Sequence, residues 1–269
     1  MLLLKQSTNL IIKQLKRTII FNTSLITNQK VLIDIIESFN SKGILFGDGV
    51  RNKIKLFKLE GKTINIKSFK TPNLINKIAY KYFRKSKARR SFEYAAILLE
   101  KGIGTPQPIA CAENFTLLGL QESFYISEHL QAELTFRELV LQPDYPDHEN
   151  ILRQFTRFTF DLHQKGIEFL DHSPGNTLIK KADDGSYSFY LVDLNRMNFH
   201  QFMDFELRMK NFNRLTPKKE MLAIMSDEYA KLYNKKYDEV FVKMCFYTND
   251  FQMKFHRKIA RKKKLLFWR

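Results

Sequence analysis

Two loops carry the residues whose types and spacing best suit chemistry. Asp171 and Asn176 share one loop, with four residues between them, after a helical stretch and before a short β-rich run. Asp193 ends the β-rich run that follows. Two carboxylates and one amide on loops at strand ends provide hard oxygen ligands and a proton acceptor. That set suits Mg²⁺ and a phosphoryl donor.

Weaker signals precede these loops. Gly47 and Gly49 lie in a turn that follows a β-rich run. Lys67 ends a strand in which apolar and polar residues alternate, and Glu93 lies in an amphipathic helical stretch. Each has an ordinary explanation, because glycines occur in hairpin turns and Glu93 could simply pair with a surface arginine such as Arg89.

The surrounding sequence predicts the elements that must position these residues. Alternating runs predict about five antiparallel strands from residue 44 onward, and a long helical pattern covers residues 73–99. The β-rich composition gives way to a helical one near residue 129. We therefore expect an N-terminal extension over 1–42, one lobe over 43–128, and a second lobe with a basic tail over 129–269.

The order of these features follows the protein-kinase plan. A glycine turn, a strand lysine, a helix glutamate, a lobe boundary, Asp-x₄-Asn and a strand-end aspartate appear in that sequence. The predicted fold class is α+β: a bilobal protein-kinase-like fold, with an antiparallel sheet and one long helix in the N-lobe and a mainly helical C-lobe.

The composition and net charge limit the classes of binding partner that we expect. The 269-residue chain has a formal net charge of +17, which attracts polyanions such as anionic lipid, phosphorylated glycolipid or nucleic acid. No RNA-binding module motif is present, so we expect no nucleic-acid partner. Cys111 and Cys245 are in no metal or redox spacing, so we interpret them as incidental thiols. No signal peptide or transmembrane run is recognisable, which predicts a cytoplasmic protein.

The sequence also resembles the lipopolysaccharide kinase (Kdo/WaaP) family, which phosphorylates sugars of the lipopolysaccharide inner core. The resemblance covers about residues 40–200 and is nearest to Kdo kinase-like members from Bacteroidetes-type bacteria. The segments that carry it are Arg51-Asn52-Lys53-Ile54-Lys55, Asn65-Ile66-Lys67-Ser68-Phe69-Lys70, Arg90-Ser91-Phe92-Glu93-Tyr94, Gly102-Ile103-Gly104-Thr105-Pro106-Gln107-Pro108-Ile109, Asp171-His172-Ser173-Pro174-Gly175-Asn176 and Val192-Asp193-Leu194-Asn195-Arg196.

The resemblance implies a role for each candidate residue. Asp171 is the catalytic residue, which accepts or orients the proton of the sugar hydroxyl. The implied metal ligands for Mg²⁺ are Asn176 and Asp193. The implied ATP-binding residues are Lys67, Glu93, Gly47, Gly49 and Glu128, the last within a hinge over residues 127–130 that hydrogen-bonds adenine.

Departures from the protein-kinase pattern refine the prediction. Phe169 and Leu170 stand where regulated protein kinases have His-Arg, so there is no evident dock for a phosphorylated activation loop and we expect constitutive activity. Asn195 replaces the glycine of Asp-Phe-Gly, and Asn52 stands where the third loop glycine would be. These changes weaken a protein-kinase interpretation but not a phosphotransferase one, because Lys67, Glu93, Asp171, Asn176 and Asp193 are all present.

The resulting hypothesis is an ATP-dependent kinase acting on a sugar hydroxyl of the inner core, with Kdo of Kdo–lipid A as acceptor. The basic segments 77–90 and 254–269 suit an anionic membrane surface, so we expect a peripheral location on the cytosolic face of the inner membrane. Two alternatives remain open: a small-molecule kinase of the aminoglycoside or choline type, and a non-catalytic nucleotide- or RNA-binding scaffold.

Overall fold

The computed structural model describes residues 9–14, 17–25, 28–49 and 52–267, without the side chains of 9–14 and 265–267. Arg51, in one of the segments that carry the family resemblance, and residues 268–269 of the basic tail lie outside the described residues. The chain forms two compact units, residues 1–131 and 132–269.

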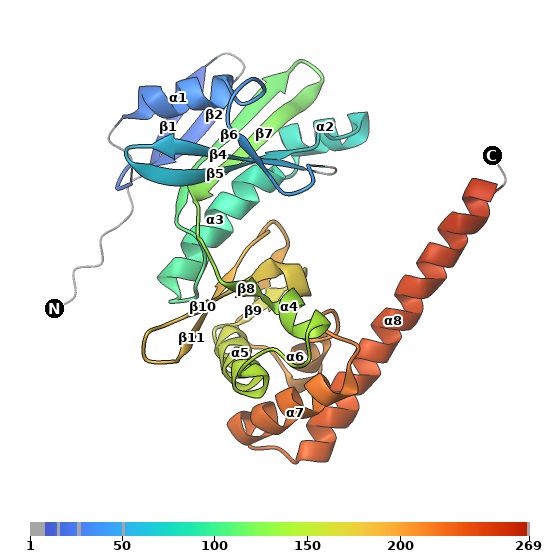
Figure 1. The fold of residues 1–269 in the computed structure, drawn as a ribbon. Coiled ribbons are helices and arrows are strands. Elements are labelled where there is room, and N and C mark those ends of the chain that lie inside the picture. The colour runs from blue at the N-terminus through green and yellow to red at the C-terminus, as the bar shows by residue number, and fades with distance from the viewer. Residues whose placement is uncertain (1–8, 15–16, 26–27, 50–51, 268–269) are drawn as a thin grey trace. The chain divides into compact units, whose positions relative to one another are not determined.

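The first unit is built on one antiparallel sheet of seven strands in the order β1-β2-β6-β7-β5-β4-β3. Its elements are β1 (Asn9–Gln14), β2 (Arg17–Asn22), α1 (Gln29–Glu37), β3 (Ile44–Phe46), β4 (Lys53–Leu59), β5 (Lys62–Phe69), α2 (Leu74–Tyr82), α3 (Lys87–Glu100), β6 (Pro108–Thr116) and β7 (Gly119–Glu128) (Figure 1). The five strands predicted from residue 44 onward are present as β3 to β7. Two further strands, β1 and β2 from the presumed extension, join the same sheet through the pairing of β2 with β6.

Strand alternation sends the side chains of this sheet into two separate cores. Ile64 and Ile66 of β5 pack with Leu32 and Ile36 of α1 on one face. Phe69, on the opposite face, packs with residues of α3 and the neighbouring strands. Each face is thus covered by a helix, α1 or α3.

The helical pattern at 73–99 forms two helices rather than one long helix. Ser86 caps α3, and its hydroxyl accepts a hydrogen bond from the N–H of Arg89 at 3.1 Å. Asn73 caps α2 in the same way. A capping residue has a non-helical backbone, so Ser86 separates the two helices.

The second unit is mainly helical, with a buried core of aromatic, leucine and methionine side chains. Its elements are β8 (Leu134–Thr135), α4 (Phe136–Leu141), α5 (His148–Gln164), β9 (Ile167–Phe169), the 3₁₀ turn η1 (Pro174–Asn176), β10 (Thr177–Lys181), β11 (Tyr187–Leu191), β12 (Met197–Phe199), α6 (Phe205–Asn211), α7 (Lys219–Tyr233) and α8 (Tyr237–Phe267). Among the described residues, no helix is both long enough and apolar enough to cross a membrane.

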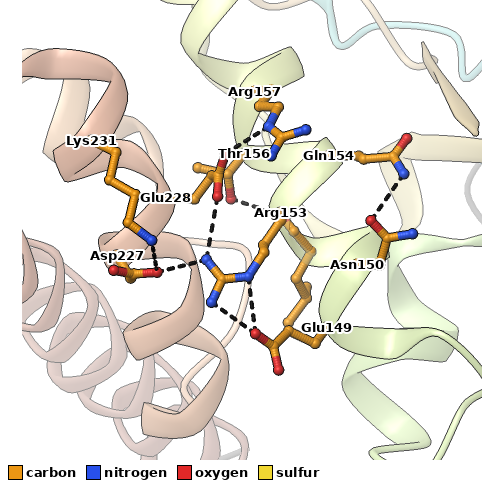
Figure 2. A network of polar contacts seen from close by, with 10 residues as sticks. Glu149, Asn150, Arg153, Gln154, Thr156, Arg157, Asp227, Glu228 and Lys231 are labelled. Carbon is orange, nitrogen blue, oxygen red and sulfur yellow. Dashed lines mark hydrogen bonds and ion pairs between the residues drawn. The ribbon is translucent and has the colours of Figure 1, made fainter.

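An ion-pair network fixes α5, the helix that leads into the Asp171 loop, against α7 (Figure 2). Arg153 contacts Asp227 at 2.6 Å, Glu228 at 3.2 Å and Glu149 at 2.7 Å. Arg157 also reaches Glu228, at 2.6 Å. Glu228 is almost fully buried, so its charge needs these partners.

Candidate active site

Backbone hydrogen bonds hold Asp171 at the end of a short strand. β9 pairs with β12 so that Phe169 lies opposite Met197. The N–H of Leu170 then donates to the carbonyl of Arg196 at 3.1 Å, which extends the pairing up to the residue before Asp171. Asp171 therefore leaves a rigid two-stranded support rather than a long mobile loop.

Asn176 closes the Asp171 loop on itself. Its side-chain Nδ2 donates to the backbone carbonyl of Asp171 at 2.8 Å, and its N–H donates to the carbonyl of Ser173 at 2.9 Å. An amide that donates through nitrogen keeps its oxygen as an acceptor for a cation. The Asp-x₄-Asn spacing is thus a local structural unit that presents one carboxylate and one amide oxygen.

Asp193 is brought to this loop by the strand before it. The N–H of Val192 donates to the carbonyl of Asn176 at 3.0 Å, so the two segments are adjacent. Asp193 has a left-handed backbone with φ +58°, an unusual conformation for a residue with a side chain. Asn195, at the position where protein kinases have glycine, donates to Asp193 Oδ1 at 2.6 Å and orients that carboxylate.

Two arginines contact the carboxylate of Asp171. Arg214 Nη1 lies 2.8 Å from Asp171 Oδ1, and it also donates to the carbonyl of Leu170 at 3.1 Å. Arg196 Nη1 lies 3.5 Å from the same oxygen. Neither arginine is among the candidate residues that the sequence indicated. Arg196 lies in one of the segments that carry the family resemblance, whereas Arg214 follows α6 and carries no sequence signal.

Two neutral histidines lie beneath the loop. Burial lowers the pKa of His163 and of His172 to about 3. His163 is hydrogen-bonded through Nδ1 to the Tyr229 hydroxyl at 2.9 Å and through Nε2 to Asn211 Oδ1 at 3.1 Å. Asn211 in turn donates to the carbonyl of Phe169 at 2.9 Å. His163 is therefore a structural residue.

The first unit places Lys67 and Glu93 on facing elements. Lys67 lies opposite Tyr125 and two residues before Phe69, so its side chain is on the sheet face that α3 covers. β5 continues to Phe69, so Lys67 does not end the strand as the sequence suggested. Phe92 of α3 packs in the same cluster as Phe69, and Glu93 follows it directly.

Glu93 is already surrounded by cations of its own helix region. Its carboxylate contacts Lys85 at 2.7 Å and Arg89 at 3.1 Å. The ion pair between Glu93 and Arg89, the ordinary explanation for Glu93 that the sequence allowed, is therefore present. It does not compete with a role at Lys67, since a carboxylate has two oxygens and accepts several hydrogen bonds.

The predicted phosphate loop and hinge also belong to the first unit. Gly47 and Gly49 follow β3 in its connection to β4, with φ +82° and +62°, which favours glycine. Glu128 pairs through its side chain with Lys62 at 2.5 Å, and its N–H donates to the carbonyl of Gln107 at 3.0 Å. The side chain of Glu128 and its N–H therefore both have partners within the first unit.

Two comparisons, one with family sequence models and one with solved structures, relate this chain to known proteins. The sequence model of the lipopolysaccharide kinase (Kdo/WaaP) family matches residues 52–237. A solved structure of WaaP in complex with acyl carrier protein aligns with a TM-score of 0.57 at 14% identity, covering 83% of this chain and 92% of that one. At that identity the likeness shows the fold, which is kinase-like.

A second solved structure, a Stt7 homolog from Micromonas algae soaked with ATP, aligns with a TM-score of 0.39 at 14% identity. It covers 57% of this chain and 48% of that one. The likeness is too low to support an argument about function. Among curated protein sequences, none matches this chain.

Proposed function

Because this chain belongs to the lipopolysaccharide kinase (Kdo/WaaP) family, we propose that it transfers the γ-phosphate of ATP to Kdo of Kdo–lipid A. The family makes the protein a phosphotransferase with a hydroxyl acceptor in the lipopolysaccharide core. The choice of Kdo as acceptor, and the resemblance to Bacteroidetes-type members, are the more specific parts of the proposal. The observation that carries the proposal of phosphoryl transfer is the Asp171 loop, which is closed by Asn176 and adjacent to Asp193.

Asp171 acts on the acceptor. Its carboxylate orients the sugar hydroxyl and accepts its proton as the bond to phosphorus forms. Arg214, at 2.8 Å, fixes the direction of that carboxylate. Phosphoryl transfer demands little covalent work from a protein, so the rate depends on positioning and charge neutralisation.

Asn176 and Asp193 are the proposed Mg²⁺ ligands. An amide oxygen and a carboxylate fit the ion, which is commonly held by one or two protein groups, substrate phosphates and water. When bound, Mg²⁺ neutralises charge on the phosphates. The hydrogen bond from Asn195 keeps the Asp193 carboxylate oriented for this role.

Lys67 is the proposed contact to the α- and β-phosphates, steered by Glu93. Its place on the α3-covered face of β5 supports this pairing. Backbone N–H groups near Gly47 and Gly49 cover the phosphates, and backbone groups around Glu128 contact adenine. These assignments follow the family plan and the position of each residue in its element.

Transfer of radiolabel from ATP to purified Kdo–lipid A tests the proposal. We expect Asp171→Ala and Asp193→Ala each to lower the rate by a factor of about 10²–10⁴. Asp183→Ala is the matched control, since Asp183 is exposed in the turn between β10 and β11. Full activity in both active-site variants would show that the catalytic assignment is wrong.

The same assay separates the small-molecule alternative. The Pro174-Gly175-Asn176 turn also occurs in kinases of the aminoglycoside and choline type, so a soluble acceptor is a specific second candidate. Label transfer to a soluble aminoglycoside or choline, with none to Kdo–lipid A, would favour that function and reject the glycolipid.

A further inference from the structure

Helix α2 presents its apolar residues outward. Leu74, Ile75, Ile78 and Tyr82 are 57%, 78%, 43% and 65% exposed, and α2 has no buried residue. Their spacing places them along one side of the helix. An ordinary surface helix has the opposite arrangement, with its apolar side against the core.

The polar edge of α2 is the side that packs against the protein. Lys77 Nζ donates to Gln121 Oε1 at 2.8 Å, and Lys81 Nζ donates to the carbonyl of Leu117 at 3.2 Å. A Cβ placed on Gly119 would lie only 2.3 Å from the Lys77 carbonyl, so the helix backbone lies directly on the β6–β7 turn. These contacts fix the outward direction of the apolar side.

Two exposed leucines lie on the neighbouring β6–β7 turn. Leu117 and Leu118, at the tip of the turn, are 96% and 64% exposed. The hydrogen bond from Lys81 to the Leu117 carbonyl places this turn beside α2. Phe83, just after the helix, adds a ring that is 86% exposed. We name Leu74, Ile75, Ile78, Tyr82, Phe83, Leu117 and Leu118 the α2 surface.

The charge around the α2 surface selects its partner. No acidic residue occurs between Glu60 and Glu93, whereas basic residues are frequent there. Exposed apolar side chains beside a ring of lysines and arginines match the boundary between acyl chains and anionic headgroups. Contiguous exposed apolar surface of this kind marks an interaction site rather than ordinary solvent-facing structure.

We propose that the α2 surface inserts into an anionic lipid bilayer and so brings the kinase to its membrane acceptor. The proposal deepens the proposed function, which supplies the reason for a lipid partner. The sequence led us to expect both basic segments, 77–90 and 254–269, at the membrane; the proposal assigns the contact to the apolar side of α2 and not to the end of α8. In α8, Phe255 and Ile259 also share one side of the helix, but they are only 47% and 37% exposed, less than Ile75 or Tyr82 of α2.

Co-sedimentation with phosphatidylcholine vesicles containing phosphatidylglycerol tests the proposal without turnover. We expect the wild-type chain to bind these vesicles more strongly than pure phosphatidylcholine vesicles. Ile75→Ser/Ile78→Ser should raise the lipid concentration for half-binding at least about tenfold, because two large side chains lose their burial. Leu141→Ser/Val242→Ser is the matched control, since both residues are comparably exposed but lie in the second unit.

Absence of wild-type binding to anionic vesicles would overturn the proposal. Binding that survives Ile75→Ser/Ile78→Ser but is lost in Phe255→Ser/Ile259→Ser would overturn it in favour of α8. A wild-type dimer in light scattering that the α2 variant converts to monomer would assign the surface to a second copy. Normal transfer by the α2 variant to a deacylated acceptor shows that the proposed function stands whatever the vesicles report.

Discussion

Replacing Arg214 by glutamine tests whether this residue holds the Asp171 carboxylate in place. The pair is 2.8 Å apart and about a quarter exposed, with side-chain exposures of 31% and 21%. A hydrogen bond to a charged group contributes about 1.5–3 kcal/mol, and partial exposure favours the lower end. Since about 1.4 kcal/mol corresponds to a factor of ten, we expect kcat to fall about tenfold.

The KM for ATP should change little, because Arg214 contacts the carboxylate assigned to the acceptor and not a group assigned to the nucleotide. Arg196→Gln is the matched control: its guanidinium lies 3.5 Å from the same oxygen and is 52% exposed. We expect it to lower kcat less than about fivefold. Steady-state kinetics with separate titrations of ATP and acceptor measure both effects.

A double variant decides whether Arg214 acts through Asp171. In an Asp171→Asn background the carboxylate charge is absent, so adding Arg214→Gln should lower the residual rate by less than about twofold. Two effects that simply multiply would refute the positioning role, and so would an Arg196→Gln defect as large as that of Arg214→Gln. Partial activity in Arg214→Lys would support the role, since lysine keeps the charge but loses the planar donor geometry.

Three further predictions concern other parts of the chain. Lys67→Met should reduce kcat/KM for ATP at least about a hundredfold. Lys85→Met, which removes a different cation near Glu93, should change kcat/KM less than about threefold. Equal defects in the two variants would contradict the assignment of Lys67 to the phosphates. Asn211→Leu removes the hydrogen bonds to His163 Nε2 and to the Phe169 carbonyl, and should lower the free energy of unfolding in urea by about 2–4 kcal/mol. A loss below about 1 kcal/mol would count against a stabilising role for Asn211. Burial lowers the pKa of His163 to about 3 from 6.5, so the unfolded chain binds a proton that the folded one does not, and stability falls as pH drops from about 6 to 4. His163→Gln should reduce that slope by about 1.4 kcal/mol per pH unit, and an unchanged slope would refute a neutral His163.

The features that the sequence predicted well are those held by local interactions. The hydrogen bond from Asn176 to Asp171 spans only the loop itself, so the spacing of the two residues already specifies the unit. Alternation of apolar and polar residues in β4 and β5 likewise depends on neighbouring residues. The split between α2 and α3 was also encoded locally, in the Ser86 cap, although the helical periodicity on both sides obscured it.

Other features depend on contacts between segments far apart in the chain. Residues 9–14 and 17–22 join the sheet only because β2 meets β6, and Arg214 reaches Asp171 only because α6 folds back toward the loop. Neither contact has a sequence period or spacing from which it could be predicted.

The sequence by itself therefore determined the kinase plan, the acidic loops and the basic character of residues 77–90. The tertiary structure alone decided which side of α2 faces the protein. An amphipathic sequence predicts which residues share a side, but the direction of that side depends on the partner, here the β6–β7 turn held by Lys77 and Lys81. That long-range contact turns a basic helical segment into an outward apolar surface.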